Sequence, residues 1–256
     1  MPDLDPTSPL ALVLLSIAGL AAGFVNTLAG GGSLLTLPAL MLCGLPADLA
    51  NGTNRVSVVV QSISGAVGYG LADKLDLRSA AAISAPTLVG ALFGSYAAAH
   101  VSAAALEPVI VVMLLALSVT LLWAPDALAP AEGTPSLRLR DRPLAIPGLF
   151  LIGAYGGFLQ AGVGLFLLAF MGGVLRIDLV RANALKVVAV GAFTAVSLTV
   201  FIIADKIVWA PGLVVAATSA IGAQLAVRYS LTRGRDAVLR LVFVMVVASC
   251  VGVLVK

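Results

Sequence analysis

The chain has 256 residues and a net charge of +3, with 61% hydrophobic and only 11% charged residues. A soluble domain carries about 25% charged residues, so this composition excludes an ordinary soluble protein. It also argues against nucleic-acid binding, because no basic stripe is interleaved with aromatic residues. We predict a single integral membrane domain over residues 1–256.

Apolar segments of helical length follow one another along the chain in two groups of about five. A bilayer core of about 30 Å requires roughly 20 apolar residues per helix. A stretch rich in Pro, Arg and Asp separates the groups and disfavours a continuous helix. We therefore predict an all-α membrane protein, with repeat 1 at 9–123, a linker at 124–142 and repeat 2 at 144–255. The predicted segments are 9–28, 33–43, 52–71, 79–99, 106–123, 144–161, 165–175, 184–203, 209–227 and 238–255.

The two groups share a pattern of polar residues and glycines at a constant spacing of 132 positions. Matches at Asn, Asp-Lys and Gly in one register indicate duplication, and membrane transporters are often built from two repeats. The clearest matches are Ala29-Gly30 with Ala161-Gly162, Asn51 with Asn183, and Asp73-Lys74 with Asp205-Lys206.

The distribution of basic residues predicts that the two repeats are inverted. Basic residues accumulate in cytoplasmic loops, so we place the linker, with Arg138 and Arg140, in the cytoplasm. Counting segments from there puts Lys74 inside, and both Asp48 and Lys206 outside. Each half then contains an odd number of segments, so the second half has the opposite orientation to the first.

The second segment of each half is short and follows a glycine break. Eleven helical residues extend only about 16 Å, too little to cross a bilayer. The breaks are Gly30–Gly32 and Gly162–Gly164, and each predicts a hairpin or broken helix, which leaves open whether the segment spans or is re-entrant. Paired glycine-interrupted segments at matching places in two halves indicate a transport site.

An Asn and a basic residue follow each short segment, and they define the candidate site. Arg55 and Lys186 lie in otherwise apolar sequence that contains almost no carboxylates. Such cations are costly to bury without negative charge, which a permeating anion would supply, and helix N-termini at the glycine breaks would add N–H donors. Two alternatives remain: Asn51 and Asn183 as helix N-caps, and snorkelling of the two cations to the interface.

We predict a substrate-binding set drawn from both halves, with no catalytic residue, no metal site and no cofactor. Gln160 precedes the second glycine break and either binds a substrate oxygen or satisfies broken-helix backbone. An enzyme is not expected, because the chain lacks paired carboxylates, a metal cluster and a Ser/His/Asp set. The predicted site residues are Gly31, Gly32, Ser33, Asn51, Thr53, Asn54, Arg55, Gln160, Gly164, Asn183 and Lys186.

These residues also carry a family resemblance. The stretch Gly23–Ser33, then Pro38 and Ala50–Asn54, resembles the sulfite exporter TauE/SafE family of bacterial membrane permeases, and Gly162–Gly164 with Asn183–Lys186 matches its second repeat. The resemblance implies an inner-membrane transporter of sulfur-containing anions such as sulfite or organosulfonates.

We therefore expect a secondary transporter that moves a small anion across the bacterial inner membrane by alternating access. The resemblance implies that it is an exporter. The alternatives are a passive anion channel of the same architecture and a permease for a non-sulfur organic anion. The expected partners are the anion and the lipid bilayer, and a homodimer is left open.

Overall fold

The computed structural model describes residues 5–106, 108–110, 112 and 136–233. The predicted fifth segments of both halves, except for residues 106, 108–110 and 112, lie outside the described residues. So does the first part of the predicted linker, up to residue 135.

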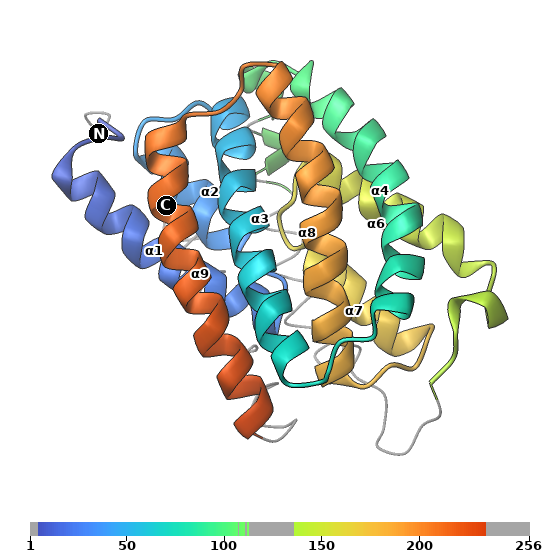
Figure 1. The fold of residues 1–256 in the computed structure, drawn as a ribbon. Helices are drawn as coiled ribbons and strands as arrows, with labels where there is room; N and C mark the ends of the chain where they lie inside the picture. Colours follow the sequence, from blue (N-terminus) through green and yellow to red (C-terminus); the bar gives the residue numbers. More distant parts are fainter. Residues whose placement is uncertain (1–4, 107, 111, 113–135, 234–256) are drawn as a thin grey trace.

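The described residues form helices and connecting turns without a β-strand, which confirms the predicted all-α class for this part of the chain. The helices that cross the molecule lie side by side, and shorter helices complete the bundle (Figure 1). Their bounds are α1 Pro9–Leu28, α2 Ser33–Leu42, α3 Ala47–Leu71, α4 Leu77–Ala99, the 3-10 turn η2 Leu139–Asp141, α6 Ala145–Phe158, α7 Val163–Gly173, α8 Leu179–Ile203 and α9 Trp209–Thr232.

The helix bounds recur at the spacing found in the sequence. Helices α3 and α8 begin at residues 47 and 179 and end at residues 71 and 203, a separation of 132 positions at both ends. Left-handed backbone recurs at the same spacing, at Asp73 with φ 54° and at Asp205 with φ 55°. Matching sequence thus produces matching local geometry in the two halves.

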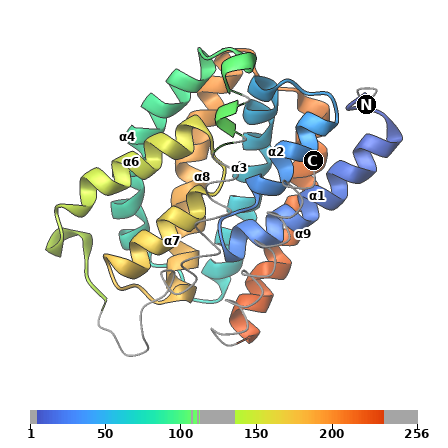
Figure 2. The same ribbon diagram turned by 180° about the vertical axis from the view of Figure 1, so that it is seen from behind.

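Helices α3 and α8 lie next to each other at the centre and run in opposite directions (Figure 1). Gly52 near the start of α3 packs on the Lys206 carbonyl just beyond the end of α8, whereas Gly65 packs on Val187 near its start. Figure 2 shows α1–α2 and α6–α7 on the other face of this central pair.

Each half contributes its first helix to the other half. Helix α1 packs along α9, and α6 packs along α4. Glycines allow the close approach, because a side chain at Gly23 would overlap the backbone of Ser219, and one at Gly94 would overlap the backbone of Ala154. Small residues at helix crossings are typical of packing between membrane helices.

Four helices in the described part of the chain are long and apolar enough to cross a membrane: α1, α4, α8 and α9. Their outward faces remain apolar, as expected for surfaces in contact with lipid. On α1 the exposed residues include Val13 and Ile17, and on α4 they include Val89 and Phe93, spaced at one helical turn. The fold is that of a multi-pass membrane protein.

Charged residues gather at the two ends of the bundle. At one end, a cavity of about 680 Å³ lies between the α3–α4 turn, the linker and the α7–α8 turn, and we call it the linker-end cavity. Its charged lining residues are Asp73, Lys74, Asp76, Arg78, Arg138, Arg140 and Arg181. At the other end, Lys206 Nζ forms an ion pair with Asp48 Oδ2 at 2.5 Å.

Two predicted helix starts were five residues too late. Helix α3 begins at Ala47 after Pro46, and α8 begins at Leu179, where the Asp178 side chain accepts a hydrogen bond from the Arg181 N–H. The N-cap interpretation of Asn51 and Asn183 is therefore wrong, because both lie inside their helices. Asn is a good cap, but Pro before a first turn and Asp at a cap are equally strong start signals.

Candidate functional site

The two glycine breaks meet inside the molecule. A side chain at Gly30 would overlap the Gly164 backbone, and one at Gly164 would overlap Gly30. Gly30 has φ 86° and Gly162 has φ 67°, so both turns use left-handed backbone, which glycine adopts without strain. The breaks thereby bring the ends of α1 and α6 into the core beside α3 and α8.

Arg55 on α3 is fully buried at 0% exposure and holds the end of α6. Its Nη1 donates to the Gly156 carbonyl oxygen at 3.2 Å, and its Nη2 donates to the carbonyl oxygens of Gly157 at 2.5 Å and Phe158 at 3.3 Å. Asn51, one turn earlier, donates from Nδ2 to the same Phe158 oxygen at 2.8 Å. These oxygens are carbonyls at the C-terminus of α6, which carries the negative end of the helix dipole.

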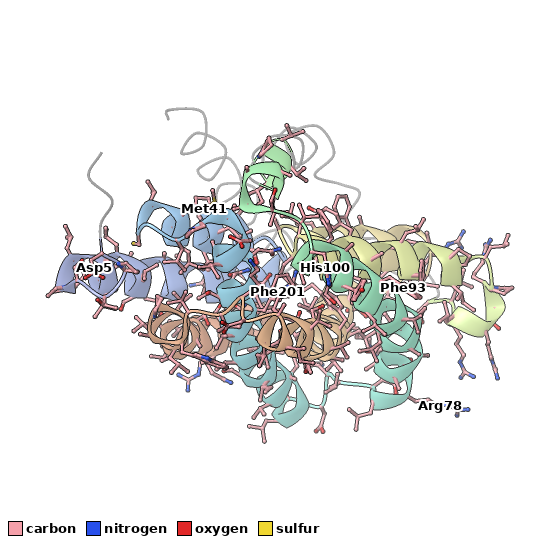
Figure 3. The ribbon with its side chains drawn as sticks, turned by 90° about the horizontal axis from the view of Figure 1, so that it is seen from above. Asp5, Met41, Arg78, Phe93, His100 and Phe201 are labelled. Carbon is pink, nitrogen blue, oxygen red and sulfur yellow. The ribbon has the colours of Figure 1, made fainter. Side chains whose placement is uncertain are left out.

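Two further side chains, Gln160 and Phe201, contact the guanidinium of Arg55, and Thr194 holds Gln160 in place. Gln160 Oε1 accepts from Nη1 at 3.1 Å and also from the Thr194 hydroxyl of α8 at 3.2 Å. The Phe201 ring lies 4.5 Å from Arg55 Cζ in a cation–π contact, and Figure 3 shows Phe201 in the interior of the bundle. We call Asn51, Arg55, Gln160, Thr194 and Phe201 the arginine cluster.

Lys186 on α8 is 1% exposed and holds the end of α1 in a corresponding way. Its Nζ donates to the carbonyl oxygens of Asn26 at 2.8 Å and Thr27 at 2.9 Å. It also donates to Asn183 Oδ1, one turn earlier on α8, at 2.7 Å. We call Asn26, Thr27, Asn183 and Lys186 the lysine cluster.

The two cations therefore cross between the halves, each binding the C-terminal end of the broken helix that belongs to the other half. Neither snorkels to the surface, so that interpretation is wrong. Nor does a carboxylate contact either cation within the described residues. Carbonyl oxygens at helix ends supply the partial negative charge instead.

The start of α2 adds a polar group that the second half does not reproduce. Asn54 Nδ2 donates to Ser33 Oγ at 2.9 Å, and Thr36 Oγ1 donates to Asn54 Oδ1 at 2.5 Å. At the corresponding positions α7 carries Leu165 and Leu168. The polar lining at a broken helix therefore belongs to the first half, whereas the lysine belongs to the second.

The arginine and lysine clusters lie at different depths in the bundle. Val187 packs beside Gly65 in the antiparallel α3–α8 pair, so Lys186 lies about ten residues beyond Arg55 along α3. At 1.5 Å per residue, their backbone positions are offset by roughly 15 Å along the helix axis. The lysine cluster is nearer the linker end and the arginine cluster nearer the Asp48–Lys206 end.

The predicted site residues are accordingly divided. Gly164 lies against the Lys186 side chain, and Gly31 and Gly32 form the turn before α2, where the Gly32 N–H donates to Asn26 Oδ1 at 3.4 Å. Thr53 lies in neither cluster, because its Oγ1 accepts from the Val208 N–H at 2.9 Å, before α9.

Sequence reasoning missed the residues that hold the cations. Asn26, Thr27 and Gly156 act through backbone carbonyls, and every residue has one, so no residue type marks them. Thr36 and Thr194 had a usable signal, since each is a polar residue in an apolar helix whose side chain needs a partner.

Two buried N–H groups at the clusters have no acceptor among the described residues. They are Arg55 Nε and Asn183 Nδ2. A buried donor without a partner costs about 1–3 kcal/mol, so an acceptor that reached either group would be stabilised there. The described residues contain no group of three or more His, Cys, Asp or Glu side chains that could hold a metal ion.

Helices broken at glycines, buried cations at the breaks and apolar outward helix faces are features typical of membrane transporters. Residues 15–254 match the sequence profile of the family described as sulfite exporter TauE/SafE. The chain belongs to this family, which confirms the resemblance seen in the sequence.

Curated relatives agree with this class. The chain is similar to "Probable membrane transporter protein YfcA" of Escherichia coli strain K12, with 28% identity over 228 residues, 89% of this chain and 84% of the relative. It is also similar to "Probable membrane transporter protein" of Haemophilus influenzae, with 26% identity over 241 residues and 91% of each chain. "Probable membrane transporter protein ORF9" of Sinorhizobium sp is 27% identical over 255 residues, 95% of this chain and 92% of the relative. No solved structure matches the chain.

Proposed function

We propose that the protein is a secondary transporter that exports a small sulfur-containing anion, such as sulfite or an organosulfonate, across the bacterial inner membrane. The observation that carries this proposal is the pair of buried cations, Arg55 and Lys186, held by carbonyl oxygens and not by carboxylates. A fully charged anion can compete for these cations more strongly than the partial charge of a helix end can. Family membership supports transport, and the sulfur chemistry comes from the family's description.

The halves are inverted in the membrane in this proposal. Support comes from the antiparallel packing of α3 and α8, which are equivalent helices of the two halves. Basic residues of the linker, of the α3–α4 turn and of α8 surround the linker-end cavity, and the positive-inside rule assigns that end to the cytoplasm. The Asp48–Lys206 pair then faces the other side.

The proposed mechanism is alternating access, and the burial of both clusters supports it. Leu175, Ile177 and Leu185 line the linker-end cavity, and Leu185 directly precedes Lys186. In this scheme, these apolar side chains separate the cavity from the lysine cluster. In the inward-facing state the cavity would extend to Lys186, and in the outward-facing state the arginine cluster would open at the other end.

The anion passes two stations in this scheme. At the first, Lys186 and the free Asn183 amide N–H bind it, with backbone N–H groups near Gly164. At the second, Arg55, Asn51 and Gln160 bind it, and the hydrogen-bonded pair of Asn54 on α3 and Ser33 at the start of α2 adds polar groups next to Arg55 along the chain. The free Arg55 Nε and Asn183 Nδ2 are donors, the polarity that oxyanion binding requires.

The test is anion flux in proteoliposomes, with radiolabelled sulfite and sulfonates as substrates. Arg55→Gln and Lys186→Gln should each reduce flux at least tenfold, because a neutral amide cannot balance the charge of the anion in the core. Arg142→Gln removes the same charge at an exposed linker position that is not among the lining residues of the cavity, so it is the matched control and should transport at the wild-type rate. Thermal unfolding in detergent identifies any variant that has lost its fold.

Unchanged flux in both site variants would contradict the site assignment. A carrier is supported if the flux saturates with anion concentration and if unlabelled anion on the opposite side of the membrane stimulates it. Flux that neither saturates nor exchanges would establish the passive channel instead, and preference for carboxylates over sulfonates would establish a permease for a non-sulfur organic anion.

A further inference from the structure

The Lys186 ammonium occupies a complete oxygen cage. An ammonium has three N–H donors and no acceptor, and each donor has one partner here: Asn26 O, Thr27 O and Asn183 Oδ1, at 2.7–2.9 Å. Two of the three oxygens terminate α1, so this one ammonium ties α8 to the end of the first broken helix. The tie depends on all three protons of the ammonium being present.

Arg55 forms the corresponding tie in the other half but differs in acid–base chemistry. A guanidinium stays protonated at any physiological pH, whereas a buried lysine amine readily exchanges its proton. Of the two crossed cations, only Lys186 can change charge during a transport cycle. The repeat has therefore placed one permanent and one titratable cation at matching helix ends.

Within the part of the chain that the structure describes, no other ionisable group contacts Lys186. Helices α1 and α7, which supply or touch the cage, carry no titratable side chain. None of the ionisable residues on the other elements packed against α8 forms a hydrogen bond or ion pair with Lys186 in the described structure. These residues are Asp48, Arg55 and Tyr69 on α3, Arg78 and Tyr96 on α4, and Tyr155 on α6. Arg181 on α8 itself also forms no such contact with Lys186. The proton on Lys186 must therefore exchange with water that enters when the site opens.

We propose that Lys186 is the proton-binding residue that couples anion movement to the proton gradient. This inference rests on the proposed transport function and adds its coupling ion. The ammonium gives its proton to water on the side to which the site is open and becomes a neutral amine. It takes a proton from water again when the site opens to the other side, so that one proton crosses for each cycle.

Loss of the proton changes the cage in a defined way. A neutral amine has two N–H donors and one lone pair, so it can satisfy only two of the three oxygens, and its lone pair repels the third. The tie between α8 and the end of α1 is then weakened. The neutral amine also cannot balance an anion in the core, so the proton and the anion bind together and cross together.

Coupling of this kind makes transport of a monovalent anion electroneutral. Flux then follows the sum of the anion gradient and the proton gradient. Net export proceeds whenever the outward anion gradient exceeds an opposing proton gradient.

The experiment uses the full chain in liposomes with methanesulfonate, because a sulfonate keeps one negative charge throughout the usable pH range. With the membrane potential held at zero, an exterior more acidic by one pH unit should sustain about tenfold accumulation of the anion. A pH dye inside the liposomes should report one proton entering for each anion.

The deciding variant is Lys186→Arg, which keeps a positive charge and hydrogen-bond donors but does not release a proton. It should retain exchange of sulfonate for sulfonate at equal pH and lose accumulation driven by the pH gradient. Lys206→Arg makes the same chemical change outside the site and should accumulate sulfonate as the wild type does.

Two results would overturn the proposal: sulfonate flux in the wild type without proton entry, and gradient-driven accumulation by Lys186→Arg equal to that of the wild type. If Lys186→Arg does not fold, the proton-to-anion ratio of the wild type decides alone. If the wild type moves no anion at all, the transport function has failed. Calorimetry of sulfonate binding in two buffers of different ionisation enthalpy then tests separately whether a proton is taken up.

Discussion

Arg55 shows how a single buried charge is accommodated without an opposite full charge. Its nitrogens reach carbonyl oxygens of Gly156, Gly157 and Phe158 and the Gln160 amide oxygen, and an aromatic ring covers its carbon. These groups replace part of the hydration that burial removes. They also satisfy carbonyls that the last turn of any helix leaves without partners.

Arg55→Met should destabilise the protein far more than loss of an ion pair near the surface. Removing the guanidinium leaves buried carbonyls at the end of α6 without donors, which costs about 2–4 kcal/mol. Lys206→Met removes the partner of Asp48 where the lysine is 31% exposed, and should cost about 1 kcal/mol or less. Thermal unfolding in detergent compares the two, and equal melting temperatures would refute the structural role of Arg55.

The sequence predicted which residues form the site but not which groups they contact. The sequence places Arg55 and Lys186 in apolar segments without carboxylates, and the structure buries both. The oxygens that hold them belong to the backbones of Asn26, Thr27 and Gly156 to Phe158. Such contacts depend on where a helix stops in space, which local sequence specifies poorly.

The broken helices are the elements that determine the geometry of both clusters. Their turns pass each other at Gly30 and Gly164 with no space for a side chain on either residue. This contact fixes where α1 and α6 end, and therefore where their terminal carbonyls lie.

Gly164→Ala should destabilise the protein by about 1–3 kcal/mol, because the added methyl group forces the two turns apart in a packed core. Gly30→Ala should cost more, since φ 86° also strains any residue with a Cβ. Gly70→Ala is the matched control: a Cβ there meets nothing within 4 Å, and alanine favours the helix. The midpoints of thermal unfolding, measured in detergent, rank the three variants by stability. A midpoint for Gly164→Ala at or above that of Gly70→Ala would show that the turns are not in contact.

Helix existence could be predicted more reliably than helix ends. The apolar stretch at 9–28 predicted α1 with both ends correct, because Pro9 and the glycines after Ala29 act as start and stop signals. For α3 and α8 the Asn residues drew the predicted starts inward by five residues. Their polar side chains are used inside the protein, against Arg55 and Lys186, so polarity there did not mark a helix boundary.

At the scale of the whole molecule, the repeat gives two central helices with matching bounds, α3 and α8, which run in opposite directions. The spacing of 132 positions was readable in the sequence, and the helix bounds repeat it. The exchange of α1 and α6 between the halves was not readable, because a repeat specifies what each unit contains and not which neighbour it packs against.

Inversion of the halves predicts opposite labelling of two equivalent residues. In a chain with both native cysteines replaced, Lys74→Cys should react with a membrane-impermeant maleimide from the cytoplasmic side, and Lys206→Cys from the other side. Lys74 follows the end of α3 and Lys206 follows the end of α8. Because these helices run in opposite directions (Figure 1), the two repeat-equivalent lysines lie at opposite ends of the bundle. Labelling of both from the same side would mean that the halves are parallel.

The pairing of α1 with α9 also has a consequence for the order of synthesis. Helix α1 is made before the other described helices, and α9 is made after all of them. Until then, Gly19 and Gly23 on the small-residue face of α1 lack their α9 neighbours Val215 and Ser219. Insertion of the helices and their assembly must therefore be separate events, and a nascent chain interrupted before α9 would leave α1 and its glycine break as a surface for membrane quality control to recognise.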